Sequence, residues 1–153
     1  MPQGQFGQPK PVWALALHGG AGPTRGRTYD AEEAHMEALL REGVTMLADG
    51  VAAIDVVSAM VAALEESGFH VAGRGAAPNL AGEYELDASI MEGTNRKAGA
   101  VGALVGFRSP IGVARRVMEA TPHVLLVGSG AAAFATAQGL EAVNDPVAYY
   151  TPA

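Results

Sequence analysis

The segment WALALHGGAG, residues 13–22, joins a short apolar run to a cluster of glycines and is followed by Pro23. The apolar residues 13–17 predict a buried strand, which the glycines end. Glycine stabilises neither strand nor helix, and it loses the most backbone freedom on folding. We therefore interpret the loop at 18–22 as a place where backbone must come close to another group. The alternative is a plain surface turn.

Composition limits the class of protein. The 153 residues are enough for one domain with a core, and 49% hydrophobic with 17% charged residues argues against disorder. The formal net charge is −6 and the sequence has no basic cluster larger than an adjacent pair such as Arg115-Arg116, so we expect no nucleic-acid partner. Without cysteine, the chain can form neither a disulfide framework nor a thiolate metal site.

Residues 1–12 predict a flexible N-terminal tail, because they contain Gln, Gly and Pro and lack the apolar core of a secretory signal. Residues 13–153 then form the folded part. No apolar run approaches the ~18 residues that a membrane helix needs, so we expect no membrane partner. The expected location is the cytoplasm.

Hydrophobic spacing predicts two consecutive helices. Asp30 followed by Glu33 is typical of a capped helix start, and apolar residues then recur at helical spacing as far as Gly50. The second helix has an apolar stripe at Ile54, Val57, Val61 and Leu64, and Gly68 lies just beyond its end. The two helices are expected to form one layer.

Strands are predicted over residues 85–91 and 98–107, joined by a polar turn, and over 124–127. Helices are predicted over 111–119, with Pro110 in the first turn, and over 131–140. Residues 144–153 have no clear period, so the chain is expected to end in irregular structure. Strands flanked by helices on both sides in the sequence favour a layered α/β fold.

Several motifs occur together with the HGGAG loop: ELDASIMEG at 85–93, KAGAVG at 97–102 and PHVLLVG at 122–128. In this order they resemble the N-terminal half of the isoaspartyl peptidase and L-asparaginase family, the plant-type asparaginases, over about residues 13–139. The resemblance implies an N-terminal-nucleophile hydrolase with a four-layer αββα sandwich, of which this chain is the α subunit. In that family a precursor cleaves itself, and the catalytic threonine becomes the first residue of the β subunit.

A threonine can attack an amide when its own α-amino group, with a pKa of about 7.7 to 8.0, serves as the base. Such a threonine must be N-terminal, and none here is. Thr94 alone follows a glycine, but polar residues follow it and it lies in a predicted turn. No serine lies in a Gly-x-Ser-x-Gly elbow; Gly128-Ser129-Gly130 comes nearest. We therefore expect no catalytic residue in this chain.

The resemblance implies that Gly19 and Gly20 lie beside the threonine of the β subunit. Val71 stands where many members have asparagine, so His70 or Asn79 are candidates to replace its hydrogen bond. The resemblance also implies a loop that holds a structural sodium ion through backbone carbonyls, those of Leu64, Glu65, Ser67, His70, Ala72 and Arg74. The alternative is an ordinary glycine-rich turn after a helix.

Two further polar groups have structural interpretations. His18, which closes a buried strand, is expected to be a satisfied structural group. Asp87 is expected to be buried between sheet layers and paired with Lys97 or Arg96, because a lone buried carboxylate costs several kcal/mol.

As a whole, the resemblance implies hydrolysis of β-aspartyl dipeptides and L-asparagine, a small peptide or amino-acid amide being the substrate. It implies no cofactor for catalysis beyond the structural sodium, a β subunit from the same precursor, and a dimer of αβ heterodimers. A glycosylasparaginase-like amidase is the nearest alternative. The other is a nucleotide-binding module, because residues 124–130 imitate a strand, glycine turn and helix start.

Overall fold

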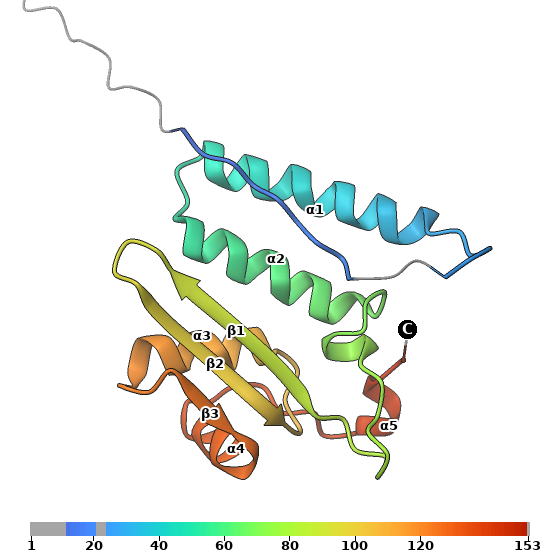
Figure 1. Ribbon diagram of the computed structural model, residues 1–153, viewed down its shortest axis with the longest axis vertical. Coiled ribbons are helices and arrows are strands. Elements are labelled where there is room, and N and C mark those ends of the chain that lie inside the picture. Colours follow the sequence, from blue (N-terminus) through green and yellow to red (C-terminus); the bar gives the residue numbers. More distant parts are fainter. Residues whose placement is uncertain (1–11, 21–23, 153) are drawn as a thin grey trace, which may run out of the picture.

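The computed structural model describes residues 12–20 and 24–152 (Figure 1). The expected tail therefore lies almost entirely outside the described residues, as do residues 21–23 of the glycine loop. The helices are α1 (Asp30–Ala48), α2 (Ala53–Ser67), η1 (a 3₁₀ turn, Gly73–Gly75), α3 (Pro110–Ala120), α4 (Gly128–Ala137) and α5 (Pro146–Tyr149). The strands are β1 (Leu86–Glu92), β2 (Lys97–Leu104) and β3 (Leu125–Val127).

The three strands form one sheet in the order β1-β2-β3. β1 and β2 are an antiparallel pair joined by the predicted polar turn, and β3 runs parallel to β2 after the crossover through α3. α3 and α4 cover one face of the sheet (Figure 1). Between them lies the larger core, in which Leu104, Val113 and Val117 are fully buried.

The helices α1 and α2 pack together as the expected layer, and α2 also contacts α3 and β1 (Figure 1). A smaller core of Leu39, Leu47, Val56 and Met60 holds them together. The expected stripe on α2 is correct in part, because Ile54 and Val61 pack against the larger core and Leu64 against the smaller. Val57, however, is 38% exposed, and the most buried residues of α2 are Val56 and Met60. Gly68 ends α2 in the left-handed region (φ 71°), as predicted.

The apolar run after residue 12 is extended, but it is not a buried strand, because it pairs with no strand among the described residues. It crosses the α1–α2 layer (Figure 1), and its side chains alternate in burial. Leu15 and Leu17 pack against the smaller core, whereas Trp13, Ala14 and Ala16 are exposed. Gly43 permits this approach, since a Cβ there would lie 2.5 Å from Cδ2 of Leu15.

Several predicted boundaries were wrong by a few residues. The N-cap residue of α1 is Tyr29 rather than Asp30, and its side chain makes no capping hydrogen bond. α4 begins at Gly128, three residues before the predicted start, because the glycine turn is itself helical. β2 ends at Leu104, and Phe107 forms only an isolated bridge with Ala142.

The end of the described chain is ordered, contrary to the expectation of irregular structure. Tyr150 is buried and stacks on Tyr84, with ring centroids 3.9 Å apart. The backbone N–H of Thr151 donates to the Arg74 carbonyl at 2.9 Å. The Tyr149 hydroxyl donates to Glu66 at 3.0 Å. These contacts hold residues 149–151 against the end of α2 and the loop that follows it.

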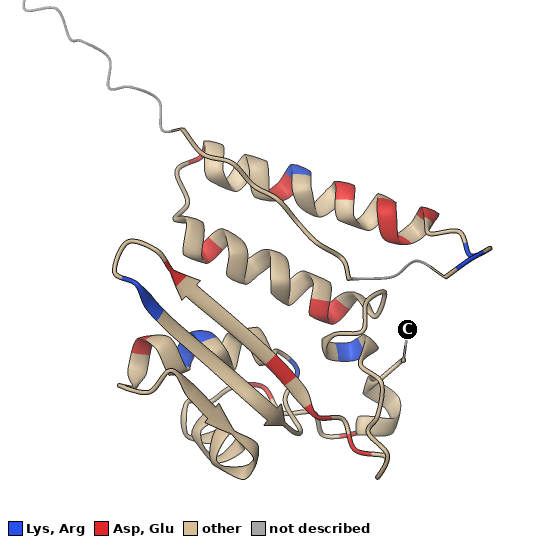
Figure 2. Ribbon diagram, in the orientation of Figure 1, with Lys and Arg blue, Asp and Glu red and all other residues tan. Residues whose placement is uncertain are grey.

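Acidic residues outnumber basic ones along α1 and α2, whereas the basic residues occur singly or in adjacent pairs on several elements (Figure 2). On α1 itself, Arg41 accompanies the acids Asp30, Glu32, Glu33, Glu37 and Glu42. Several arginines are already paired with acids; Arg108, for example, bridges Glu66 and Glu141 at 2.5 and 2.7 Å.

Candidate functional site

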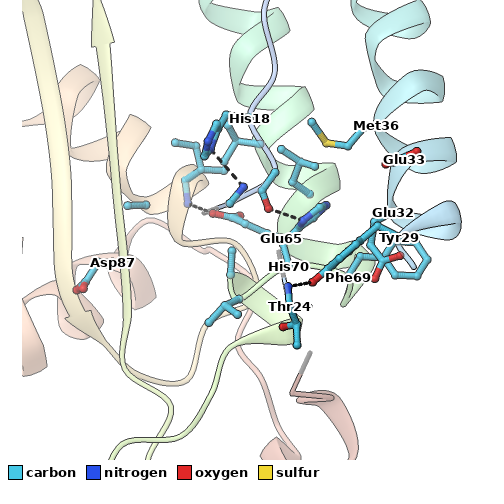
Figure 3. A pocket seen from close by; sticks show the side chains of 18 of the residues that line it. His18, Thr24, Tyr29, Glu32, Glu33, Met36, Glu65, Phe69, His70 and Asp87 are labelled. Carbon is cyan, nitrogen blue, oxygen red and sulfur yellow. Dashed lines mark hydrogen bonds between the residues drawn. The ribbon is translucent and has the colours of Figure 1, made fainter. Parts of the chain in front are cut away.

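A cleft of about 1080 Å³ lies between the α1–α2 layer and β1. It brings together the two sequence regions that were predicted to support a site. Of the predicted residues, Gly19, Gly20, Leu64, Glu65, His70, Val71 and Ala72 line the cleft, while Ser67 and Arg74 do not. Figure 3 shows His18, Glu65 and His70 converging in it from three different segments.

The glycine segment enters the cleft in a conformation that requires glycine. Gly20 has φ 121°, which side-chain-bearing residues rarely adopt. At Gly19 an added Cβ would lie 3.1 Å from Cε1 of His70. The predicted close approach therefore occurs, and among the described residues the group that comes close is the His70 ring.

Two imidazoles bind the backbone of this segment. The Gly20 N–H donates to Nδ1 of His18 at 3.2 Å, and Nδ1 of His70 donates to the Gly19 carbonyl at 2.8 Å. His18 is exposed, so the prediction of a group closing a buried strand was wrong, although its ring is hydrogen-bonded. His35 on α1, which sequence reasoning missed, lies 6.2 Å from His70 between ring centroids.

Glu65 forms the inner wall of the cleft with its side chain as well as its backbone. The carboxylate is 3% exposed and accepts hydrogen bonds from the Ser109 hydroxyl and the Ile111 N–H, both at 2.9 Å. Burial raises the pKa of Glu65 to about 7, although these two hydrogen bonds act in the opposite direction. The first turn of α3 contains no acid of its own, and the Glu65 side chain provides the acceptor for the free Ile111 N–H of that turn.

The outer wall of the cleft carries a polar cluster that sequence reasoning also missed. Arg27 pairs with Glu32 at 2.6 Å, and its guanidinium carbon lies 4.9 Å from the centroid of the Tyr29 ring. The Thr24 N–H donates to the Tyr29 hydroxyl at 2.6 Å, which lowers the pKa of Tyr29. Helical spacing from residue 30 onward gave no sign that the residues before α1 fold back onto it.

The loop after α2 is curled tightly by two glycines. A Cβ at Gly73 would lie 2.5 Å from the Glu65 carbonyl oxygen, and one at Gly75 would lie 2.1 Å from that of His70. Neutral carbonyl oxygens brought together by curved backbone are donors that suit a hard cation. Some already accept hydrogen bonds, as His70 does from the Ala72 N–H at 2.7 Å, but a carbonyl has a second lone pair. The donor set therefore fits a sodium ion.

Asp87 lines the cleft from β1, and it is exposed rather than buried between layers. Its partner is also not the predicted Lys97 or Arg96. The carboxylate accepts from the Ala103 N–H at 2.8 Å, where the register of β1 and β2 shifts and Ala103 has φ 48°. Asp87 thus stabilises a β-bulge, which is a structural role.

Other candidate groups lie elsewhere. Thr94 is in the exposed turn between β1 and β2 and is not among the residues that line the cleft. Over the described part of the chain, no group of three or more His, Asp or Glu side chains could hold a metal ion. No helix of that part is long and apolar enough to cross a membrane.

Comparison with known proteins places the chain in a family. The family model described as "Asparaginase" (Asparaginase_2) matches residues 11–152, so the chain belongs to that family, as its motifs predicted. The match includes residues 124–130, the segment that imitates a nucleotide-binding turn. The mixed arrangement of helices around a small sheet agrees with the expected α/β class.

Curated relatives are similar over most of this chain. It is 42% identical over 130 residues to the human isoaspartyl peptidase/L-asparaginase, covering 82% of this chain and 41% of that protein. It is 40% identical over 138 residues to the isoaspartyl peptidase of Escherichia coli (87% and 43%), and 44% over 128 residues to the plant-type L-asparaginase of Pyrococcus furiosus (82% and 41%). The chain thus spans less than half the length of these relatives.

Proposed function

We propose that this chain is the N-terminal part of a threonine amidohydrolase that hydrolyses β-aspartyl dipeptides and L-asparagine. The observation that carries the proposal is the cleft, because the family's glycine loop and the loop after α2 meet there across 51 residues of sequence. The names of the relatives supply the substrate class. The nucleophile is the N-terminal threonine of a β subunit that the same precursor provides.

An open sheet face supports the need for a β subunit. Ile90 and Leu126 pack toward α3 and α4, so the alternate residues of β1 and β3 point the other way. There Met91, Leu125 and Val127 are 54–63% exposed. Apolar residues gathered on one face mark an interaction site. A second sheet packed on this face, opposite α3 and α4, would complete the αββα sandwich.

In the proposed reaction the threonine hydroxyl attacks the substrate amide and the α-amino group of the same threonine takes the proton. The amine or ammonia leaves, and water then releases the aspartyl group. This chain contributes the bare backbone of Gly19 and Gly20 beside the nucleophile. We further propose a cytoplasmic dimer of αβ units. A glycosylasparaginase-like amidase, differing in the leaving group, is the alternative within the class.

The test is to express the complete coding sequence and to measure its intact mass and its activity. We expect two copurifying polypeptides in equal amount, the second beginning with threonine, and release of free aspartate from a β-aspartyl dipeptide and from L-asparagine. A single uncleaved polypeptide without amidase activity would overturn the proposal. Preference for a glycosylated asparagine would select the alternative.

Replacing Gly20 with valine is expected to block maturation or to lower turnover at least tenfold, because valine at this φ twists the loop beside the nucleophile. Gly82→Val is the matched control, since Gly82 has φ 84° and lies outside the cleft. Intact mass and initial rates are measured for both variants. Equal loss in the two would show that backbone strain alone is responsible.

Val71→Asn is expected to raise kcat about tenfold, the value of one additional hydrogen bond in the transition state. Val71 is 75% exposed at the cleft, so we expect stability to change by less than about 0.5 kcal/mol. Leu80→Asn, at an exposed position outside the cleft, is the control. An unchanged kcat in Val71→Asn would mean that this side chain does not face the nucleophile.

We propose that the loop after α2 binds sodium. Replacing sodium chloride by choline chloride at equal ionic strength is then expected to destabilise the full-length protein by about 1–3 kcal/mol, the linkage effect of an ion present at ten to a hundred times its Kd. Thermal unfolding measures the change, and titrating sodium back should restore the melting temperature. Identical melting in the two salts would contradict sodium binding.

A further inference from the structure

The peptide bond between Gly19 and Gly20 is held at both of its polar groups by imidazole rings. Its carbonyl oxygen, from Gly19, accepts from Nδ1 of His70 at 2.8 Å. Its N–H, on Gly20, donates to Nδ1 of His18 at 3.2 Å. Figure 3 shows both rings in the cleft, His18 from the segment itself and His70 from the loop after α2.

These partners fix the proton positions on the two rings. A backbone N–H can only donate, so Nδ1 of His18 accepts and a neutral His18 carries its proton on Nε2. A carbonyl oxygen can only accept, so Nδ1 of His70 must carry a proton. When both rings are neutral, these bonds require opposite tautomers, a pattern that solution measurements can detect.

The surroundings hold the His70 ring in place. The ring is close enough to Gly19 that a Cβ there would be 3.1 Å from Cε1. His35 lies 6.2 Å away between ring centroids, and His35 in turn contacts Phe69 edge-on at 5.4 Å. Nε2 of His70 is inaccessible and has no hydrogen-bond partner among the described residues. The ring therefore has one anchoring bond, the one to Gly19.

We propose that His70 and His18 are positioning residues that set the orientation of the Gly19–Gly20 peptide for the reaction of the cleft. A peptide between two glycines rotates with little steric resistance, and rotation would exchange the directions of its carbonyl and N–H. With both groups bound, one orientation is favoured. This inference rests on the proposed function, because it assigns a role to a loop that the proposal puts beside the nucleophile.

The activity test uses the full-length, fully processed protein. His70→Phe keeps a ring but removes the donor, and we expect kcat to fall about tenfold with KM within twofold of wild type. His70→Asn restores a donor near the Nδ1 position and should recover kcat to within threefold of wild type. His35→Phe is the matched control, because His35 makes no hydrogen bond to the glycine segment, and its kcat should stay within twofold.

Variants of His18 provide a second part of the activity test. His18→Phe should also lower kcat, and His18→Asn, whose side-chain oxygen can accept from Gly20, should restore it. Since both rings act on one peptide, the double variant His18→Phe/His70→Phe should lose much less activity than the product of the two single losses. Equal effects of His70→Phe and His35→Phe, or strictly multiplicative losses, would overturn the proposal.

Histidine ¹⁵N chemical shifts provide a measurement that does not depend on activity or on variants that fold. With ¹⁵N-labelled histidine at a pH where the rings are neutral, we expect His70 protonated on Nδ1 and His18 on Nε2. The Nε2–H tautomer at His70 would overturn the proposal. A full-length protein that has these tautomers but no amidase activity would refute the proposed function. The two hydrogen bonds to the Gly19–Gly20 peptide would still be confirmed.

Discussion

Replacing Gly99 with alanine is expected to destabilise the protein by about 3 kcal/mol, more than most single methyl insertions, because the new atom meets backbone rather than side chain. Gly99 lies on β2 where α3 crosses it. A Cβ there would lie 2.2 Å from the Ala114 carbonyl oxygen and 2.5 Å from the Met118 nitrogen. Neither atom can move without displacing α3 from the sheet. Such a displacement would disturb the larger core, which lies between α3 and the sheet.

The free energy of unfolding in urea and the soluble yield of the full-length protein test this prediction. Gly93→Ala is the control, since Gly93 lies in the turn just before β2 and nothing surrounds an added Cβ there. That variant should differ from wild type by less than about 0.5 kcal/mol. If the two variants were equally stable, the contact between β2 and α3 would be looser than described.

The second large effect is expected from Glu65→Gln, and it depends on pH. Burial raises the pKa of Glu65 to about 7 from its ordinary value of 4.5, so near neutral pH the folded protein holds a proton that the unfolded chain has already released. The stability from protonated Glu65 is fully present below pH 4.5 and is lost as the pH rises through 7. Across this window the loss amounts to about 3 kcal/mol.

Glutamine does not titrate, yet its amide can accept from the Ile111 N–H and donate to the Ser109 hydroxyl. Glu65→Gln should therefore remove up to about 3 kcal/mol of pH dependence between pH 5 and 8. Glu66→Gln is the control: its neighbour Arg108 helps to lower the pKa of Glu66, which should not titrate in this window. Urea unfolding at several pH values gives the slopes. If the free energy of unfolding of Glu65→Gln changed with pH as much as that of the wild type, the Glu65 carboxyl would be hydrated in solution.

Most of the regular structure could be predicted because local sequence determines it. The β1–β2 hairpin follows from two apolar runs around a polar turn, and α3 follows from Pro110 with Ser109 as its cap. The helix α2 ends at Gly68 because glycine alone tolerates φ 71° at no cost. The family and its glycine loop followed from short motifs that retain their order along the chain.

What could not be predicted depends on contacts between distant residues. The extended segment after residue 12 looks like a strand in sequence, but pairing requires a neighbour that local sequence does not specify. The burial of Glu65 depends on the arrival of α3, 44 or more residues away. The contact of His70 with Gly19 spans 51 residues. Asp87 was misjudged for the same reason, since its bulge forms only when two strands shift register.

The open face of the sheet has a consequence for making this protein in the laboratory. Met91, Leu125 and Val127 are exposed there, and β3 leaves one edge of its backbone unpaired among the described residues. An unpaired strand edge beside exposed apolar side chains promotes aggregation, because copies of the chain can pair through that edge. Synthesised alone at high concentration, these 153 residues should accumulate in inclusion bodies. Translation as a single polypeptide with the proposed β subunit would cover that surface before copies of the chain meet.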